Sequence, residues 1–442
     1  MTTSTPSALS DFLTSLHTHG PDTILPATPY SVFDVATATA AYDELLQALP
    51  LDEVWVAIKA APVPALVDAL NLRGASFDIA SVGEMRMCFE AGVKPEQLSF
   101  GNPVRSLPDL RLAADMGVRT WVVDSALEVE RVAHNAPGSR VVIRIWTSGK
   151  GADWPLNQRY GCTPEQAVEL GRSAHRLGLN VGGISFHVGS LQRDIHAWDR
   201  PVRDAAAVWS ELAREGVDGL ELLNIGGGLP GPGYRHPAPP LTEFAKAITT
   251  AVDTHFADRP RLVAEPGRSL VAAAGATITS VNGVVERGDG QVYVFLDGGL
   301  FNCGLLESLD GAVEYRIVSP EHPGPAVDQQ SDPDGTVQVP ARTDEQQPAS
   351  SPLPDGDART TSSQHHLAQD EKLDPGPDTT LMEARIQGPS CDGMDQLGAK
   401  TPYLVPKKLS PGDHLVLLDT GAYTTSYSST FNGFGLAPLV VL

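Results

Sequence analysis

Between Val54 and Ala264, short apolar runs alternate with longer amphipathic segments, and this alternation constrains the fold more than any other feature of the sequence. Each apolar run has the length of a buried parallel strand, and each amphipathic segment is long enough to be a covering helix. The pattern predicts eight strands, at Val54–Ala60, Ser76–Ile79, Leu98–Phe100, Thr120–Val123, Val141–Trp146, Gly182–His187, Leu220–Ile225 and Arg261–Ala264.

Eight parallel strands joined by helices at this length indicate a (β/α)8 barrel, which we expect to occupy residues 27–265. A doubly wound sheet is the alternative. It is less favoured because no GxGxxG opens a helix after the first strand.

The regions that flank the predicted barrel have a different composition. Residues 1–26 are rich in Ser and Thr and are expected to form a flexible N-terminal tail with a short helical patch. After Pro266, strand patterns at Gly275–Glu286, Gln291–Leu296 and His414–Leu418 are not separated by long helices. They predict a C-terminal β domain over residues 266–442, to which early N-terminal residues are a candidate addition.

Residues 320–380 interrupt this second domain and contain no Phe, Trp, Tyr, Ile or Met. Such a segment buries too little apolar surface to offset the entropy of ordering it. We expect a disordered acidic insertion. A regulatory role is one interpretation, and a tolerated loop expansion is the simpler one.

The net charge of −22 argues against partners that are nucleic acids or anionic membranes, which require basic surfaces. No Lys or Arg precedes Lys59, so neither a secretory signal nor a transit peptide is expected, and no apolar stretch is long enough to cross a bilayer. The four cysteines form no CxxC pair, which favours neither a disulfide framework nor a metal site. A cytoplasmic location fits best.

Lys59 interrupts the first expected strand, in the run VWVAIKAAPV. A buried stem with its amine in water is the simpler interpretation, and an amine kept neutral to form a Schiff base is the alternative. The rest of the chain decides, because the carboxyl ends of barrel strands meet at one face. The residues expected there are Lys59, Asp78, Ser81, Arg144, His187, Ser190, Gly226, Gly227, Gly228, Glu265, Gly267 and Arg268.

These strand-end residues match the needs of one cofactor. Three consecutive glycines let backbone N–H groups approach a phosphate, and Ser190, Gly267 and Arg268 would complete a phosphate cup. Glu265 could face a cationic ring nitrogen, and His187 could stack on a planar ring. With an imine-forming lysine, these are the groups that pyridoxal 5′-phosphate (PLP) requires.

A series of motifs carries a resemblance to a known family. The chain resembles the fold-type III PLP-dependent amino-acid decarboxylases, the group with ornithine, lysine, arginine and diaminopimelate decarboxylases. The resemblance implies an alanine-racemase-like barrel followed by a β-sandwich domain, in a homodimer whose subunits share active sites. It extends from about residue 28 to 442 without the insertion, in the motifs VAIKAAP, FDIASVGEM, GNPVRS, SFHVGS, NIGGGLPG, AEPGRS, GPSCDGMD and GAYTTSYSSTFNGF.

The resemblance also implies roles for individual residues. Lys59 resembles the PLP-binding lysine, His187 the ring-stacking histidine, and Glu265 the partner of the pyridine nitrogen. Tyr423 resembles the tyrosine that reaches the phosphate, and Asp78 and Arg144 are expected beside the cofactor. Cys391 and Asp392 resemble a pair donated by the second subunit, in which Cys391 would return a proton to Cα. Arg159 and Asp395 resemble positions that pair across the interface.

The far end of the substrate decides among members of this family. Asp392 stands where diaminopimelate enzymes typically have Glu, and it suits a distal ammonium; Glu307 is expected as a second carboxylate on the same cation. We rank ornithine first, giving putrescine for polyamine biosynthesis, then lysine, giving cadaverine, then arginine. The alternatives are a decarboxylase of diaminopimelate or of a D- or carrier-tethered amino acid, a racemase, or a catalytically dead regulatory homologue.

Overall fold

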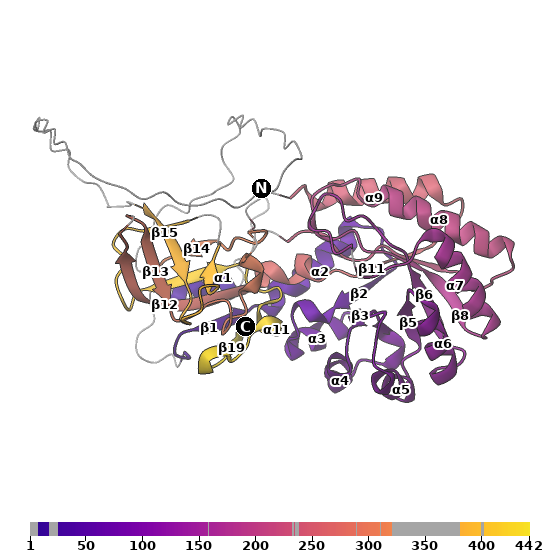
Figure 1. Cartoon of the computed structure of the whole chain (residues 1–442), viewed down its shortest axis with the longest axis horizontal. Coiled ribbons are helices and arrows are strands. Elements are labelled where there is room, and N and C mark those ends of the chain that lie inside the picture. The colour runs from indigo at the N-terminus through magenta and orange to yellow at the C-terminus, as the bar shows by residue number, and fades with distance from the viewer. Residues whose placement is uncertain are drawn as a thin grey trace, which may run out of the picture.

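The computed structural model describes residues 8–16, 25–157, 159–231, 234, 238–288, 290–309, 311–320, 381–398 and 402–442. These residues form two bodies, a barrel wrapped in helices and a β domain beside it (Figure 1). The insertion predicted at 320–380 lies outside the described residues apart from Pro320. So do residues 1–7 and 17–24 of the predicted tail.

The alternating segment folds into a closed parallel barrel, as predicted, and the doubly wound alternative is wrong. Around the barrel the strands follow one another in chain order, which is the arrangement that successive βα units produce. Within the described residues its strands are β2 (Glu53–Ala57), β3 (Ser76–Ile79), β4 (Leu98–Phe100), β5 (Thr120–Val123), β6 (Arg140–Arg144), β8 (Asn180–Ser185), β10 (Leu222–Asn224) and β11 (Arg261–Ala264).

Helices cover the outside of the barrel (Figure 1). Several begin at polar caps: the side chains of Asp34, Ser81, Ser106 and Thr163 each accept a backbone N–H of the first turn. The helices are α2 (Val35–Ala48), α3 (Pro64–Asn71), α4 (Val82–Glu90), α5 (Leu107–Asp115), α6 (Ala126–Asn135), α7 (Pro164–Arg176), α8 (Asp199–Arg214) and α9 (Leu241–His255).

The barrel strands are buried on both sides, which explains why their sequences are apolar without strict alternation. In β2, Val54 and Val56 belong to the large core that includes the helices, whereas Trp55 belongs to a separate cluster. That cluster takes one residue from each of five strands, as side chains in a barrel interior do. Its members are Trp55, Val122, Val142, Leu222 and Val263.

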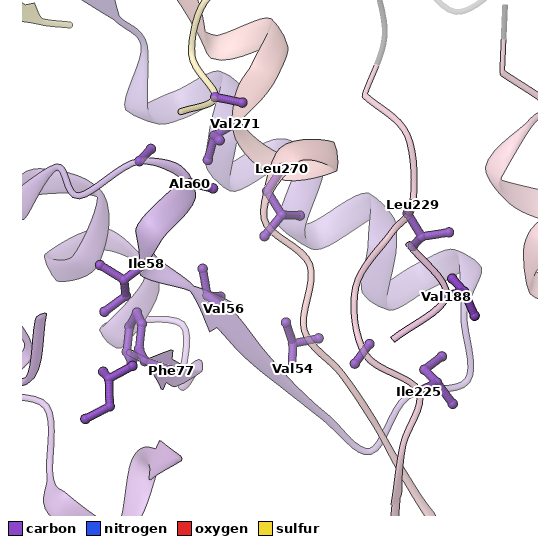
Figure 2. Packing of buried hydrophobic residues seen from close by; sticks show 14 of the residues in the cluster. Val54, Val56, Ile58, Ala60, Phe77, Val188, Ile225, Leu229, Leu270 and Val271 are labelled. Carbon is purple, nitrogen blue, oxygen red and sulfur yellow. The ribbon is translucent and has the colours of Figure 1, made fainter. Parts of the chain in front are cut away.

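Strand β2 is shorter than predicted, and the difference positions Lys59. The sequence predicted a strand through Ala60, but the strand ends at Ala57 and Ile58–Ala60 form a 3-10 turn. The N–H of Ala57 donates to the carbonyl of Pro266, in the loop that follows β11, at 3.0 Å. Ile58 and Ala60 pack into the apolar core (Figure 2), and Lys59 between them is left at the rim.

The β domain is a mixed sheet of nine strands within the described residues. Tyr30–Phe33 (β1) belongs to this sheet and not to the barrel, because it pairs with β12 and β19, so an early N-terminal segment adds a strand to the β domain. The strands that follow the barrel are β12 (Gly275–Glu286), β13 (Val292–Leu296), β14 (Ile317–Val318), β15 (Leu381–Gln387), β16 (Gln396–Leu397), β17 (Tyr403–Pro406), β18 (His414–Leu418) and β19 (Leu439–Val441).

Part of the predicted N-terminal tail is packed against this sheet. Residues Ala8–Ser15 form helix α1, whose Leu9 is buried with Tyr30, Val32 and Ile278. The N–H of Leu9 also donates to the carboxylate of Asp34 at 3.2 Å. This segment is therefore a docked helix: its apolar face packs on the sheet, and Asp34 accepts an N–H of its first turn, which has no partner within the helix.

Candidate active site

Lys59 and Asp78 meet at the carboxyl ends of β2 and β3. The Lys59 Nζ lies 3.3 Å from Asp78 Oδ2. The aspartate is 4% exposed, and its second oxygen, Oδ1, is buried without a hydrogen-bond partner among the described residues. A side chain at Gly101 would come within 1.8 Å of that oxygen, so glycine at this position makes room for the carboxylate.

The charge on Lys59 differs from the prediction. Desolvation by the surrounding wall lowers the pKa of Lys59, but the Asp78 carboxylate outweighs it, so the pKa is raised. The amine is surrounded by protein and still reachable by solvent, since 49% of the side-chain surface is exposed. In the chain without cofactor, Lys59 is thus held as an ammonium, and the expectation of a neutral lysine is wrong for this state.

Glu265 follows β11 and is fixed by Asn224 of β10. The Asn224 amide donates to Glu265 Oε1 at 2.6 Å, and its carbonyl oxygen accepts the Gly226 N–H at 2.9 Å. Burial and the nearby Asp78 raise the pKa of Glu265 to about 7, although Lys59 and Asn224 act in the opposite direction. This carboxyl therefore exchanges its proton near neutral pH.

His187 follows β8 and is held as a neutral ring. Burial, with the positive charges of Arg144 and Lys59, lowers the pKa of His187 to about 3. Its Nδ1 accepts the N–H of Gly189 at 3.0 Å, so in the neutral ring the proton is on Nε2. That edge faces the glycine loop, because a Cβ built on Gly227 would lie 3.2 Å from Nε2.

The Gly226–Gly228 loop approaches the neighbouring strand ends so closely that side chains would not fit. A Cβ at Gly226 would lie 2.1 Å from the carbonyl oxygen of Phe186, and one at Gly228 would lie 2.3 Å from that of Gly189. Both residues have positive φ, 68° and 107°. Glycine at these positions therefore lets the loop run directly against the neighbouring strand ends, which a side chain would prevent.

Tyr423 brings the β domain to this end of the barrel. Its N–H donates to the carbonyl of Ala60 at 2.6 Å, directly beside Lys59. A Cβ at Gly267 would lie 3.0 Å from the Ala60 side chain and 3.6 Å from the Tyr423 hydroxyl. Apolar side chains lie beside this contact: Ala60 lies near Val271, which belongs with Leu270 to the short helix α10 (Arg268–Val271) (Figure 2).

Arg268 and Glu307 contact each other, which the sequence did not predict. The sequence placed Arg268 on a phosphate and Glu307 on the substrate tail, but the structure joins their side chains in a two-pronged ion pair with N–O distances of 2.6 and 2.7 Å. Arg268 also faces the rings of Trp154, Tyr234 and Tyr423. Glu307 is therefore not a free carboxylate in this chain.

Arg144 ends a barrel strand, and Ser190 begins a strand outside the barrel. Arg144 ends β6, and its charge acts on Asp78, His187 and Glu265. Ser190 begins β9 (Ser190–Gln192), which pairs with β7 (Ala152–Trp154) in a small sheet above the barrel.

Arg159 stacks on Tyr160 at 5.3 Å, and Arg144 lies at 5.4 Å from the same ring.

Cys391 and Asp392 lie on the loop after β15, in the β domain. Cys391 is exposed, and its sulfur accepts the Asn432 amide at 3.4 Å. Asp392 is partly exposed, and its carboxylate accepts the Met394 N–H at 2.8 Å. Both side chains are therefore available at the surface of the single chain.

Asp395 is not available for a pair across an interface. Its carboxylate is 2% exposed and accepts the N–H groups of Leu300 and Ser390 at 2.8 and 2.9 Å. It fastens one loop of the β domain to another, so the expected pairing with Arg159 of a partner does not agree with its burial.

Two residues of the site were not assigned by the sequence. Asn224 precedes the glycine loop in NIGGG, and its amide could have been recognised as a cap for that turn. Glu84 is the third residue of α4; burial raises its pKa, and its carboxylate accepts the Ala80 N–H at 2.6 Å. Its position three residues after Ser81 is the signal of a capping box.

Comparison with known proteins assigns the family. Residues 35–272 match the model of the pyridoxal-dependent decarboxylase, pyridoxal binding domain. The chain belongs to the pyridoxal-dependent decarboxylases. This decarboxylase is 30% identical over 414 residues to a lysine/ornithine decarboxylase of Selenomonas ruminantium, covering 94% of this chain and 89% of the relative. It is 28% identical over 426 residues to antizyme inhibitor 2 of Xenopus laevis, covering 93% and 80%.

A solved structure agrees with this assignment. The lysine decarboxylase from Selenomonas ruminantium superposes with a TM-score of 0.75 at 28% identity, covering 97% of this chain and 95% of the other. The barrel and the added β domain are thus the family's fold, and the chain is a PLP-dependent carboxy-lyase. Among the helices in the described part of the decarboxylase, none has the length and apolar character needed to cross a membrane.

The residues present fit PLP. Three consecutive glycines at a strand end form the kind of loop that binds a phosphate, and Lys59 is reachable from solvent. Two buried polar atoms at the site, Asp78 Oδ1 and Arg268 Nε, lack partners among the described residues. Buried polar atoms of a finished site are normally paired, so these atoms are consistent with a bound polar group.

Proposed function

We propose that this decarboxylase converts L-ornithine to putrescine, with L-lysine as second substrate and L-arginine as third. The observation that carries the proposal is the convergence of Lys59, Asp78 and Glu265 at one mouth, with the Lys59 amine 3.3 Å from Asp78. The similarity to a lysine/ornithine decarboxylase over nearly the whole chain supports the substrate class.

PLP, when bound, takes up the electron pair that remains at Cα after the carboxylate leaves as CO2. Lys59 is proposed to hold the cofactor covalently, and Asp78 to keep the lysine amine oriented toward it. His187 would lie flat against the ring as a neutral imidazole, which adds no charge to it. Glu265 would lie at the ring nitrogen, where a carboxyl with a pKa near 7 can hold or share the proton.

Phosphate binding is proposed for the Gly226–Gly228 loop together with Ser190, Gly267, Arg268 and Tyr423. Glycine backbone N–H groups can approach an anion closely, and in this loop the Gly226 N–H is already taken by the Asn224 side chain. The buried guanidinium of Arg268 supplies a permanent positive charge nearby, because the Arg268 pKa is raised above its ordinary value: burial lowers it, but the carboxylate of Glu307 outweighs the burial.

The active site is proposed to be completed by a second copy of the chain. Cys391 is exposed and Asp392 is partly exposed in the single chain, on a loop where the family resemblance implies a contribution to the partner's site. In a homodimer Cys391 would deliver a proton to Cα, and Asp392 would bind the distal ammonium of the substrate.

Absorbance of the purified full-length protein tests the cofactor assignment. With PLP added, the protein should show a visible band from covalently bound cofactor, and Lys59→Ala should remove it. Lys94→Ala is the matched control, because Lys94 is exposed and lies outside the site. A wild-type protein that shows no band with saturating PLP would refute the assignment.

Substrate choice is tested by incubating the loaded protein with ornithine, lysine, arginine and diaminopimelate and measuring the amines and CO2 released. We expect kcat/KM to fall in the order ornithine, lysine, arginine. The similarity to an antizyme inhibitor gives a second candidate, a regulatory homologue without activity. That candidate would be favoured by a protein that binds PLP and releases no CO2 from any of these amino acids.

Mixing two inactive variants tests the shared site. Lys59→Ala and Cys391→Ala homodimers should each be inactive as carboxy-lyases, and a mixed population should regain about a quarter of the wild-type activity. That fraction follows because half of the molecules are mixed dimers and one of the two sites in each is intact. No recovery from a mixture that exchanges subunits would place Cys391 in the site of its own chain.

A further inference from the structure

The carboxylate of Glu307 is already occupied in this chain. Its Oε2 lies 2.6 Å from Nη1 of Arg268, and its Oε1 lies 2.7 Å from Nη2. The side chains are 11% and 4% exposed, so the pair is nearly closed to solvent. A carboxylate held at both oxygens by a buried guanidinium offers little to the cationic end of a substrate.

Arg268 is held on all sides that the structure describes except at Nε. The rings of Trp154, Tyr234 and Tyr423 lie 5.3, 5.7 and 4.8 Å from the guanidinium carbon. Nη1 also donates to the Tyr234 hydroxyl at 3.3 Å. The Nε atom is buried and has no hydrogen-bond partner among the described residues, although an arginine normally uses this donor.

The free donor belongs to a residue on the wall of the phosphate cup. Gly267 precedes Arg268 and faces Ala60 and the Tyr423 hydroxyl. A Cβ at Gly231 would lie 2.9 Å from the Ala272 side chain and 3.3 Å from the carbonyl oxygen of Arg268, so little space remains beside the Arg268 backbone. The two Nη groups are held by Glu307.

We propose that Glu307 is a positioning residue for the phosphate of the cofactor: it holds both Nη groups of Arg268 and leaves the Nε–H for the phosphate. The proposal rests on the proposed PLP-dependent function and assigns Glu307 a role other than the predicted grip on the substrate. The ion pair is neutral as a unit, so recognition of the distal ammonium passes to Asp392 of the second copy.

Cofactor affinity and substrate affinity separate the two roles of Glu307. The Kd of PLP is measured by titrating cofactor-stripped full-length protein and following the visible band, and KM for ornithine is measured at saturating PLP. Glu307→Gln keeps the shape and removes the charge that holds Arg268. We expect PLP to bind about tenfold more weakly, because a charge-assisted hydrogen bond is lost, and KM to stay within about twofold.

Three further variants secure the test. Glu286→Gln, an exposed glutamate of the β domain, should leave both constants unchanged. Glu307→Asp keeps the charge one methylene shorter, should give an intermediate Kd of PLP, and carries the test if circular dichroism shows that Glu307→Gln does not fold. Arg268→Ala with Glu307→Gln should bind PLP no more weakly than Arg268→Ala alone.

An unchanged Kd of PLP in Glu307→Gln, with a KM about tenfold higher, would overturn the proposal and make Glu307 a substrate ligand. Additive effects of the Arg268 and Glu307 variants on the Kd of PLP would overturn it as well. Failure of the proposed function itself is distinguishable, because the wild-type protein would then show no band at any PLP concentration.

Discussion

Replacing Asn224 with alanine should destabilise the cofactor-free protein in a pH-dependent way. The change removes a bond of 2.6 Å to Glu265 and leaves the Gly226 N–H without the oxygen that accepts it at 2.9 Å. Asn224 is 0% exposed, so water does not readily replace either partner. A hydrogen bond to a charged group is worth about 1.5–3 kcal/mol, and a buried unpaired N–H costs about 1–3 kcal/mol. We expect a total loss of about 2.5–6 kcal/mol in the free energy of unfolding at pH 8.

The pH dependence follows from the Glu265 pKa of about 7, which the Asn224 bond lowers. Below pH 6 the carboxyl is mostly protonated, so the amide loses a charged partner and the variant should cost less. Urea denaturation at pH 5.5 and pH 8 measures the difference. In a Glu265→Gln background the same Asn224→Ala change should cost equal amounts at both pH values. Equal costs at both pH values in the wild-type background would refute the reasoning, as would a loss below about 1 kcal/mol.

Other residues give predictions of the same kind. The His187 pKa of about 3 lies below its ordinary value of 6.5, so the unfolded chain binds a proton that the folded chain does not as pH falls. The contribution of His187 to stability should be full above pH 6.5 and decline toward pH 3. His187→Asn should flatten this decline, measured by urea denaturation between pH 7 and pH 5. Gly226→Ala forces alanine into the left-handed region and brings its Cβ within 2.1 Å of the Phe186 carbonyl oxygen. It should therefore destabilise the protein by well over the roughly 1–2 kcal/mol expected for Gly178→Ala, where a Cβ meets nothing within 4 Å. Comparable melting temperatures of the two variants would contradict this. Asp395→Ala removes the carboxylate oxygens that accept the backbone N–H groups of Leu300 and Ser390, and it should lower the free energy of unfolding by about 2–4 kcal/mol in urea denaturation. A change below about 0.5 kcal/mol would contradict that assignment.

The barrel was predictable because its strands are buried on both faces and its helices are not. That difference determines the order of apolar and polar residues along the chain. The observed bounds of β3, β4 and β5 match the predicted ranges residue for residue. The end of β2 was not predictable in the same way. The strand ends at Ala57, whose N–H donates to the carbonyl of Pro266 in a segment far along the chain. No local sequence pattern indicates that contact.

Side-chain partners account for the remaining differences at the site. Residue types at the strand ends indicated PLP, but the protonation of Lys59 depends on Asp78, 19 positions away in the sequence. The Arg268–Glu307 pair joins residues 39 positions apart in the sequence, so it cannot be read from the surroundings of either residue. The same is true of the partners of Tyr30–Phe33, which lie in β12 and β19, far along the chain.

The pairing of β1 with β12 and β19 has a consequence for synthesis on the ribosome. Strand β1 leaves the ribosome before any barrel strand, while the strands that hold it leave after the barrel is complete. The barrel can therefore close while β1 still has an unpaired edge, and the β domain must wait for the final residues of the chain. A nascent chain stalled before residue 439 should bury its barrel core and still present this apolar strand to chaperones.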